Sequence, residues 1–453
     1  MNVVVIGLGY VGLTTAVALA YLKNNVVGID IDSKKINELN QKRSPIYEPH
    51  LDVLLKKLDI IYMSEYDKHV IQNADVIFIT VGTPPLPDGK PDLRFVKEAV
   101  INIGKNISHK SNTLIVNKST VPVGTAHWVK NLIKRQLKTP NNVSVVSNPE
   151  FLREGTALYD TFYPDRIVVG ADNSAAIQIL YDLYSPIIKQ NFDPPPELPR
   201  PQNVEQVPFL AMDTTSAELT KYAANSFLAL KISFINEIAL LAEKVGGNIT
   251  LIANAIGLDK RIGGQFLKAG VGWGGSCFGK DTAALIEIAK MYDSNLAIVE
   301  AARNVNYSQR RFVVSKLISK LQLLRGREIG ILGLTFKPNT DDLRDSPALS
   351  IINELLKYGV YVKVHDPIAL RKLPHELASE VCLCERIEDL AKDSDAILLI
   401  TDWPQYRQLD WKRIYKLMNN PYILDSRNFL DCKKLTDIGF KYEGIGKRCV
   451  TYS

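Results

Sequence analysis

The chain repeats one pattern twice: a short run of β-branched residues, a glycine turn, and a stretch with helical periodicity. In the first third, the strand-like runs lie at residues 3–6, 26–29, 76–81, 113–116 and 143–146. Strands that alternate with helices in this way form parallel, doubly wound sheets, because each strand needs a crossover before the next. We therefore expect an α/β fold whose first domain, residues 1–209, is Rossmann-like.

The last third restarts the same pattern. Residues 328–333 repeat the first strand and its glycine turn, and residues 361–366 and 395–401 repeat two later strands. The second turn lacks the full dinucleotide spacing, so a second Rossmann-like domain, residues 306–453, is expected to bind another ligand. Between the two domains, residues 210–305 contain a long helix that is apolar on several faces and is expected to be buried, with a subunit contact as one option.

A glycine fingerprint follows the first strand. Gly7 suits a tight turn, Gly9 lets the backbone approach a pyrophosphate, and Gly12 lets the helix pack closely on the strand. Asp30, about 20 residues downstream at the end of the second strand, suits the ribose hydroxyls and favours NAD over NADP. Lys35 is the feature that leaves NADP open.

Composition excludes several classes of protein. Apolar residues at 46% and charged residues at 23% match a globular chain, and the net charge of +6 is scattered, so no nucleic-acid partner is expected. Apolar runs end short of the ~20 residues that a membrane span needs, so we expect no membrane partner. The opening strand-like run has no signal pattern, which favours the cytoplasm. No cysteine or histidine pair has metal-binding spacing, so no metal is expected.

The most informative stretch runs from Gly270 to Asp281. Its glycines would let the backbone wrap around a ligand, and the helical pattern from Thr282 onward places Cys277 near a helix N-terminus, where a thiolate is favoured. Asp281, one turn later, could hold a water molecule or accept a proton. Taken alone, a single cysteine is more often a small buried side chain than a nucleophile.

Lys221 and Asn225 stand at positions i and i+4 of the long helical stretch. A helix puts both side chains on one face, where an ammonium and an amide can stabilise an oxyanion.

Several motifs in the same order resemble the UDP-glucose/GDP-mannose dehydrogenase family over nearly the whole chain. Besides the glycine fingerprint, they lie at residues 81–84, 118–125, 148–155, 217–225, 270–281 and 333–344. The resemblance implies NAD as cofactor and UDP-glucose as substrate, oxidised twice to a carboxylate. It also implies that Cys277 holds the sugar as a thiohemiacetal and then as a thioester, and that two Rossmann-like domains are joined by a long central helix.

The resemblance also implies roles for individual residues. Catalytic roles fall on Cys277, Lys221, Asn225, Asp281, Glu150 and Thr120. Cofactor contacts beyond Gly7, Gly9, Gly12 and Asp30 fall on Tyr10, Val11, Lys35, Thr83, Glu154 and Arg344. Substrate contacts fall on Phe151, Leu152, Arg153, Lys221, Asn225, Phe266, Gly274, Phe336, Lys337, Arg427 and Arg261. The family contributes the arginine at position 261 across a dimer interface, so a homodimer or higher homo-oligomer is expected.

Two alternatives stay open on the sequence. The first is a related enzyme that acts on GDP-mannose or on a UDP-N-acetylhexosamine. The second is an NAD-binding regulatory module without catalysis, since a fold does not fix a function. The combination of Cys277, Lys221, Asn225 and Asp281 argues against the second, because a regulatory module needs none of them.

Overall fold

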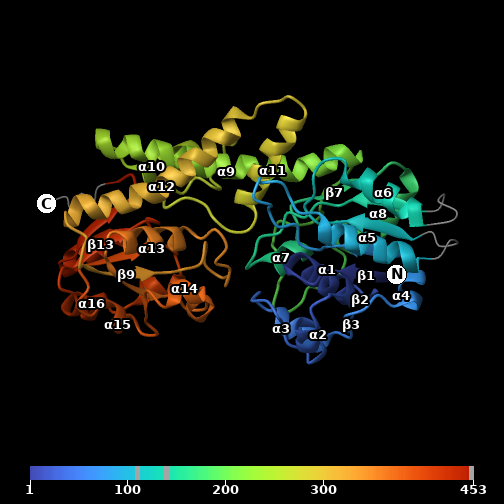
Figure 1. The fold of residues 1–453 in the computed structure, drawn as a ribbon, viewed down its shortest axis with the longest axis horizontal. Helices are drawn as coiled ribbons and strands as arrows, with labels where there is room; N and C mark the ends of the chain where they lie inside the picture. Colours follow the sequence, from blue (N-terminus) through green and yellow to red (C-terminus); the bar gives the residue numbers. More distant parts are fainter. Residues whose placement is uncertain (108–112, 137–142, 448–453) are drawn as a thin grey trace. The chain divides into compact units, whose positions relative to one another are not determined.

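The computed structural model describes residues 1–107, 113–136 and 143–447. The chain divides into two compact units, residues 1–224 with 283–292 and residues 225–282 with 293–453. Each unit has its own sheet, drawn in blue to green for the first and in orange to red for the second (Figure 1).

The first unit is built on one sheet in the order β3-β2-β1-β4-β5-β6-β7-β8. Its strands are β1 (Asn2–Ile6), β2 (Asn25–Ile29), β3 (Ile61–Met63), β4 (Val76–Ile79), β5 (Leu114–Asn117), β6 (Ser144–Ser147), β7 (Ile167–Gly170) and β8 (Phe209–Met212). All neighbours pair in parallel except β6 and β7. The five predicted strands are confirmed, whereas β3, β7 and β8 were not predicted.

Helices cover both faces of this sheet. They are α1 (Tyr10–Tyr21), α2 (Ser33–Asn40), α3 (Leu51–Lys57), α4 (Lys68–Gln72), α5 (Arg94–Asn106), α6 (Thr125–Gln136), α7 (Ala157–Phe162) and α8 (Ser174–Ile188). Alternate residues of β1 supply the two cores: Val3 and Val5 pack on the side of α1 and α8, and Val4 and Ile6 on the side of α5 and α6. Burial on both faces explains why the strand is apolar without interruption.

The second unit contains a parallel sheet in the order β11-β10-β9-β12-β13-β14. Its strands are β9 (Glu328–Leu332), β10 (Tyr361–His365), β11 (Cys382–Leu383), β12 (Ala396–Leu399), β13 (Tyr422–Asp425) and β14 (Lys441–Gly444). Its helices include α10 (Ile249–Gly257), α12 (Ala297–Leu321), α13 (Pro347–Lys357), α14 (His375–Ala378), α15 (Ile387–Ala391), α16 (Trp411–Leu417) and α17 (Cys432–Ile438). The predicted second Rossmann-like fold is thereby confirmed.

The chain passes from one unit to the other within α9 (Thr214–Val245), within α11 (Phe278–Met291) and again just after α11. By length and composition alone, α9 is the one helix of the described residues that would be long and apolar enough to span a membrane. Two polar side chains in its C-terminal half nevertheless bond within the second unit. Ser233 donates to the carbonyl of Ala302 at 2.7 Å, and Asn236 accepts from the amide of Gly270 at 2.8 Å.

The proline-rich segment at residues 193–201 forms neither helix nor strand, as its sequence indicates. It is fixed to the first unit by the hydroxyl of Tyr163, which donates to the carbonyl of Leu198 at 2.8 Å, and by an ion pair of 2.6 Å between Lys57 and Glu197.

Candidate active site

The glycine fingerprint forms a tight turn between β1 and α1. Gly7 has a φ of +93°, and a Cβ on Gly12 would lie 1.8 Å from the carbonyl oxygen of Gly7. These two glycines are therefore required by the fold of the turn itself. Gly9 differs, since a Cβ there would have nothing within 4 Å. The open space beside Gly9, at the N-terminus of α1, fits the close approach of a dinucleotide pyrophosphate.

Asp30 closes β2 next to this turn. Its Oδ2 accepts hydrogen bonds of 2.7 Å from the amide of Leu8 and from Nζ of Lys35, and its Oδ1 accepts from the amide of Asp32 at 3.0 Å. The carboxylate thus fixes the turn and brings Lys35 beside it. Both predicted cofactor residues lie together at the carboxyl end of the strand, where parallel sheets bind ligands.

Thr83 and Thr120 also lie together, after β4 and β5. The hydroxyl of Thr83 donates to the carbonyl of Thr120 at 2.7 Å. Tyr10 and Val11 form the start of α1, and the hydroxyl of Tyr10 donates to the carbonyl of Tyr47 at 3.3 Å. These predicted cofactor residues of the first unit therefore lie around the carboxyl ends of β1, β2 and β4, an arrangement that fits NAD, whereas Glu154 lies in the loop between β6 and α7.

A buried ion pair joins Glu150 to Lys221. Oε1 of Glu150 lies 2.9 Å from Nζ of Lys221, and the side chains are 7% and 4% exposed. Burial tends to raise the pKa of Glu150, but the charge and hydrogen bond of Lys221, the amide of Leu152 and the charge of Lys118 together hold this pKa below its usual value. Glu150 is therefore a carboxylate at neutral pH, although it is shielded from water.

The loop that carries Glu150 is held by charged neighbours. Oε2 of Glu150 accepts from the amide of Leu152 at 2.6 Å, and the guanidinium of Arg166 stacks 3.8 Å from the ring centre of Phe151. Arg153 forks onto Asp160, with a closest distance of 2.5 Å. The charge of Arg153, a predicted substrate contact, is thus already paired within the first unit.

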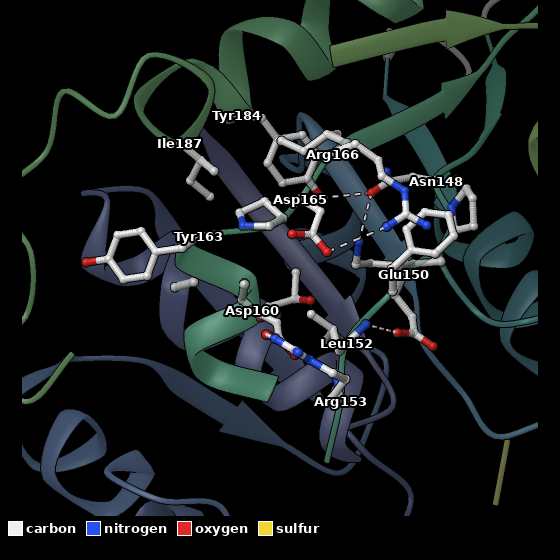
Figure 2. A pocket seen from close by; sticks show the side chains of 18 of the residues that line it. Asn148, Glu150, Leu152, Arg153, Asp160, Tyr163, Asp165, Arg166, Tyr184 and Ile187 are labelled. Atoms are coloured by element: carbon white, nitrogen blue, oxygen red, sulfur yellow. Dashed lines mark hydrogen bonds and ion pairs between the residues drawn. The ribbon is translucent and has the colours of Figure 1, made fainter. Parts of the chain in front are cut away.

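A cavity of about 70 Å³ lies beside this loop. Figure 2 shows the Glu150 carboxylate turned toward the amide of Leu152, and the hydroxyl of Tyr184 directed at Asn148. The polar residues that line the cavity are Thr15, Lys118, Asn148, Glu150, Arg153, Asp160, Thr161, Tyr163, Asp165, Arg166 and Tyr184. A cavity of this size and polarity holds water molecules.

Cys277 lies in the second unit, immediately before α11. The amide of Asp281 donates to the carbonyl of Cys277 at 2.8 Å, which places Cys277 at the start of the helix. The helix begins at Phe278, earlier than the sequence indicates, because the glycine-rich loop turns directly into it. The predicted setting of a cysteine at a helix N-terminus is confirmed.

Asp281 is the centre of a polar cluster one turn after Cys277. Its Oδ2 accepts from the amide nitrogen of Asn225 at 2.6 Å, and its Oδ1 lies 2.7 Å from Nζ of Lys280. The structure therefore brings together Asn225 and Asp281, both of which the sequence singles out. It adds Lys280, which no spacing in the sequence marks as functional.

The loop before Cys277 is anchored by long helices. The amide of Trp273 donates to Asn306 at 2.7 Å, and the side chain of Gln309 donates to the carbonyl of Gly270 at 2.8 Å. Its glycines have a packing role that the sequence did not reveal. A Cβ would lie 2.6 Å from a backbone oxygen at Gly270 and 2.3 Å from another at Gly274. These positions are filled by neighbouring protein atoms, not by space for a ligand.

Predicted substrate residues of the second unit meet around the same loop. The guanidinium of Arg427 donates to the carbonyls of Ile400, Gly272 and Phe336 at 2.7, 3.2 and 3.1 Å. Gly275 packs against the ring of Phe336, which a Cβ would approach to 2.8 Å. Arg427 is therefore a link between the cysteine loop and the turn after β9.

The remaining predicted contacts follow the same loop and turn. Nζ of Lys337 lies 5.5 Å from the ring centre of Phe336, and the carbonyl of Arg344 accepts from the amide of Gly275 at 3.0 Å. The ring of Phe266 lies 6.3 Å from that of Phe278. Arg261 is 89% exposed and forks onto Asp259 at 2.6 Å. Of these, Arg261 projects furthest into solvent, and the side chain of Arg344 is 61% exposed.

Three family models match the chain in sequence. They are the NAD-binding, central and UDP-binding domains of the UDP-glucose/GDP-mannose dehydrogenase family, at residues 1–188, 215–308 and 330–432. UDP-glucose 6-dehydrogenase YwqF of Bacillus subtilis is 42% identical over 100% of this chain and 99% of its own length. UDP-glucose 6-dehydrogenase of Rickettsia conorii is 41% identical over 99% and 100%.

Solved structures with the same fold include a UDP-glucose dehydrogenase from Pyrobaculum islandicum, with a TM-score of 0.86 and 38% identity over 98% of each chain. A UDP-D-ManNAc dehydrogenase from Pyrococcus horikoshii has a TM-score of 0.84 and 26% identity over 99% of this chain and 100% of that one. The fold is therefore shared among enzymes whose names give different sugars.

Proposed function

Because the chain belongs to the UDP-glucose/GDP-mannose dehydrogenase family, we propose that it oxidises the C6 alcohol of UDP-glucose to a carboxylate with two molecules of NAD. The observation that carries this proposal is the position of Cys277 at the start of α11, with Asp281 one turn later and bonded to Asn225. An NAD-binding regulatory module would have no use for this cluster.

Bound NAD would accept a hydride in each of the two oxidations. Cys277 is the nucleophile. Its sulfur adds to the aldehyde carbon to form a thiohemiacetal, whose carbon still bears the second hydride. After the second oxidation the sugar is a thioester of Cys277. Attack by water then breaks the C–S bond, restores the thiol and releases the carboxylate and a proton.

The first unit supplies a base and an ammonium for this chemistry. Glu150 is ionised and can accept the proton of the attacking water. Lys221, paired with it at 2.9 Å, can donate to an oxyanion while its charge keeps Glu150 deprotonated. Asn225 lies four residues after Lys221 on α9, where its amide would donate to the same developing charge.

The alternative substrates are GDP-mannose and the UDP-N-acetylhexosamines. UDP-glucose is favoured because the UDP-glucose 6-dehydrogenase of B. subtilis is 42% identical to this chain, whereas the UDP-D-ManNAc dehydrogenase of P. horikoshii is 26% identical. A panel of these sugar nucleotides with NAD tests the choice. We expect NADH and the uronate only with UDP-glucose, at about two NADH per sugar. Oxidation of GDP-mannose or UDP-N-acetylmannosamine at an equal rate would contradict it.

The covalent step has its own test. We expect Cys277→Ala to bind both ligands but to form no uronate, and Cys277→Ser to accumulate a covalent ester, because an alkoxide is a poorer leaving group than a thiolate. Mass spectrometry of the serine variant after addition of UDP-glucose and NAD would detect this adduct. Normal uronate formation by Cys277→Ala would eliminate the mechanism.

We also propose that the enzyme is a cytoplasmic homodimer or higher homo-oligomer. In the second unit, the exposed side chains Phe227, Phe234 and Leu241 recur every seven residues along α9, so they share one face. An apolar face of this kind suits a subunit contact. Arg261, which projects into solvent, would then reach the site of the partner subunit.

Hybrid dimers test the role of Arg261. Arg261→Ala and Cys277→Ala are each expected to be inactive, while their mixture recovers activity, because one site of the hybrid carries both intact residues. No recovery after verified subunit exchange would contradict the proposal. We further propose that residues 1–209, 210–305 and 306–453 are the NAD-binding, dimerisation and sugar-nucleotide domains.

A further inference from the structure

Lys118 is a cation of the first unit that the proposed mechanism does not use. It follows β5 and borders the cavity beside the Glu150 loop. Its Nζ donates to Oδ1 of Asn148 at 3.1 Å. Among the described residues, Lys118 makes no direct ion pair, so its charge acts on its neighbours through space.

Asn148 connects Lys118 to the backbone that carries Glu150. Its backbone amide donates to Asn117 at 2.9 Å, and its side-chain nitrogen donates to the carbonyl of Val168 at 2.8 Å. The hydroxyl of Tyr184 donates to the same Oδ1 at 2.8 Å. These hydrogen bonds fix Asn148 without the help of Lys118. A purely structural role therefore does not explain the lysine.

The charges that face Lys118 come from several segments. The pKa of Lys118 is lowered to about 8, mainly by burial; Glu150 opposes this effect, and Lys221 on α9 adds to it. Arg166 and Asp165, before β7, lie on the same cavity, as do Arg153 and, on α7, Asp160, which pair with each other. The helices α1 and α8 add no charged side chain to it. At neutral pH Lys118, Lys221 and Glu150 thus contribute two ammonium groups and one carboxylate.

We propose that Lys118 is a positioning residue of the reaction, whose ammonium, held by Asn148 beside the Glu150 loop, keeps Glu150 ionised for the hydrolysis of the thioester. The inference rests on the proposed function. This role explains why the ammonium of Lys118 lies near Glu150, a carboxylate that already pairs with Lys221. Two cations stabilise the carboxylate while Lys221 turns its hydrogen bonds toward the substrate.

The test compares Lys118→Met and Lys118→Arg with the wild type. Methionine is close to lysine in shape and removes the charge, whereas arginine keeps it. Lys130→Met is the matched control, because Lys130 belongs to the same unit but pairs with Asp172 at 2.9 Å at the surface. Thioester hydrolysis is followed by rapid quench of one turnover with UDP-glucose and NAD across the acid range.

In Lys118→Met we expect the acid limb of hydrolysis to move to higher pH by about 0.5 to 1 unit, because Glu150 loses one of its stabilising charges. Lys118→Arg should restore the wild-type limb, and Lys130→Met should leave it unchanged. In a Glu150→Gln background, Lys118→Met should move no limb. If the methionine variant does not fold, Lys118→Gln, whose amide can still donate to Asn148, serves the same comparison.

The inference would be overturned if a folded Lys118→Met or Lys118→Gln variant hydrolysed the thioester with the same acid limb as the wild type. A lower melting temperature together with an unchanged limb would indicate that Lys118 has a structural role alone. Failure of the proposed function is a different result: the wild type itself would then produce no UDP-glucuronate.

Discussion

The two glycine turns of this protein begin alike and end differently. Gly7 and Gly333 have φ values of +93° and +91°. In each turn the amide of the following residue donates to an aspartate after the next strand, Asp30 at 2.7 Å and Asp366 at 2.8 Å. Both units therefore contain the same arrangement of a strand, a glycine turn and an aspartate that accepts from the turn.

The two turns differ in the segment that comes after each of them. In the first unit α1 begins at Tyr10, and Gly12 brings it against the turn. In the second unit α13 begins only at Pro347, and the intervening loop carries Phe336 and Lys337. The first turn therefore presents a helix N-terminus to its ligand, while the second presents side chains. A shared turn fixes the location of a ligand, and the next residues decide its chemistry.

The largest expected effect is that an added methyl group in each turn weakens the binding of a different ligand. Gly12→Ala places a methyl group 1.8 Å from a backbone oxygen, and Gly333→Ala places one 2.3 Å from Cβ of Thr401. We expect the first to weaken NAD binding at least about tenfold and the second to weaken UDP binding by as much, since overpacking costs ~1–3 kcal/mol or more. Calorimetric titration of both ligands into both variants checks this. Equal loss of both ligands in either variant would break the comparison.

Gly9→Ala sharpens the same point without disturbing the fold. Its φ of −81° suits alanine, and no protein atom lies within 4 Å of the new methyl group. We expect an unchanged melting temperature and NAD affinity reduced about threefold to tenfold, because the methyl group meets only the pyrophosphate. Unaltered NAD affinity would show that the space beside Gly9 is not used by the cofactor.

Substitution of the two aspartates, Asp30 and Asp366, should also affect different properties, but by smaller amounts. Asp366 also accepts from Trp403 at 3.1 Å and from three further backbone amides, so Asp366→Asn should cost about 1–3 kcal/mol of unfolding free energy and leave NAD affinity unchanged. Asp30→Asn should lower the preference for NAD over NADP. Urea denaturation and turnover with both cofactors measure these effects. An unaltered cofactor preference in Asp30→Asn would remove the distinction.

The smallest effect concerns pH. Ionic partners hold the pKa of Glu150 below its usual 4.5, so its stabilising contribution is present above that value and is lost as the pH falls through the lower folded value. Burial raises the pKa of Asp425, in the second unit, above 3.8, so its ionisation lowers stability as the pH rises through that window.

Urea unfolding from about pH 3 to 7 should therefore show opposite changes of slope for Glu150→Gln, below its usual pKa of 4.5, and for Asp425→Asn, above its usual pKa of 3.8, relative to wild type. Slopes that change in the same direction would contradict the assigned charges.

Much of the fold could be predicted because parallel strands that are buried on both faces have uninterrupted runs of β-branched residues in the sequence. The strands that escaped prediction lack that signal. β3 has three residues, and much of β8 is exposed, so their pairing with neighbours decides their structure. β7 is apolar, but its antiparallel pairing with β6 depends on the path of the chain between them.

The placement of a site residue was predictable where it depends on local spacing, as for Cys277 and the helix that begins after it. Partners distant in sequence could not be predicted. Lys118 reaches Asn148 across 30 positions, a contact that only the pairing of β5 with β6 creates. The glycines around Trp273 suggested a ligand, yet Asn306 and other protein atoms fill their space.

This anchoring of the cysteine loop limits the ways in which the enzyme can evolve. Gly270, Gly272, Gly274 and Gly275 each lie where a single methyl group would collide with the scaffold. Random libraries at these four positions should therefore return almost only glycine, whatever substrate is used for selection. A change of sugar must be sought at positions whose side chains can vary without disturbing the nucleophile, and among the described residues the exposed Arg261 is the first to randomise.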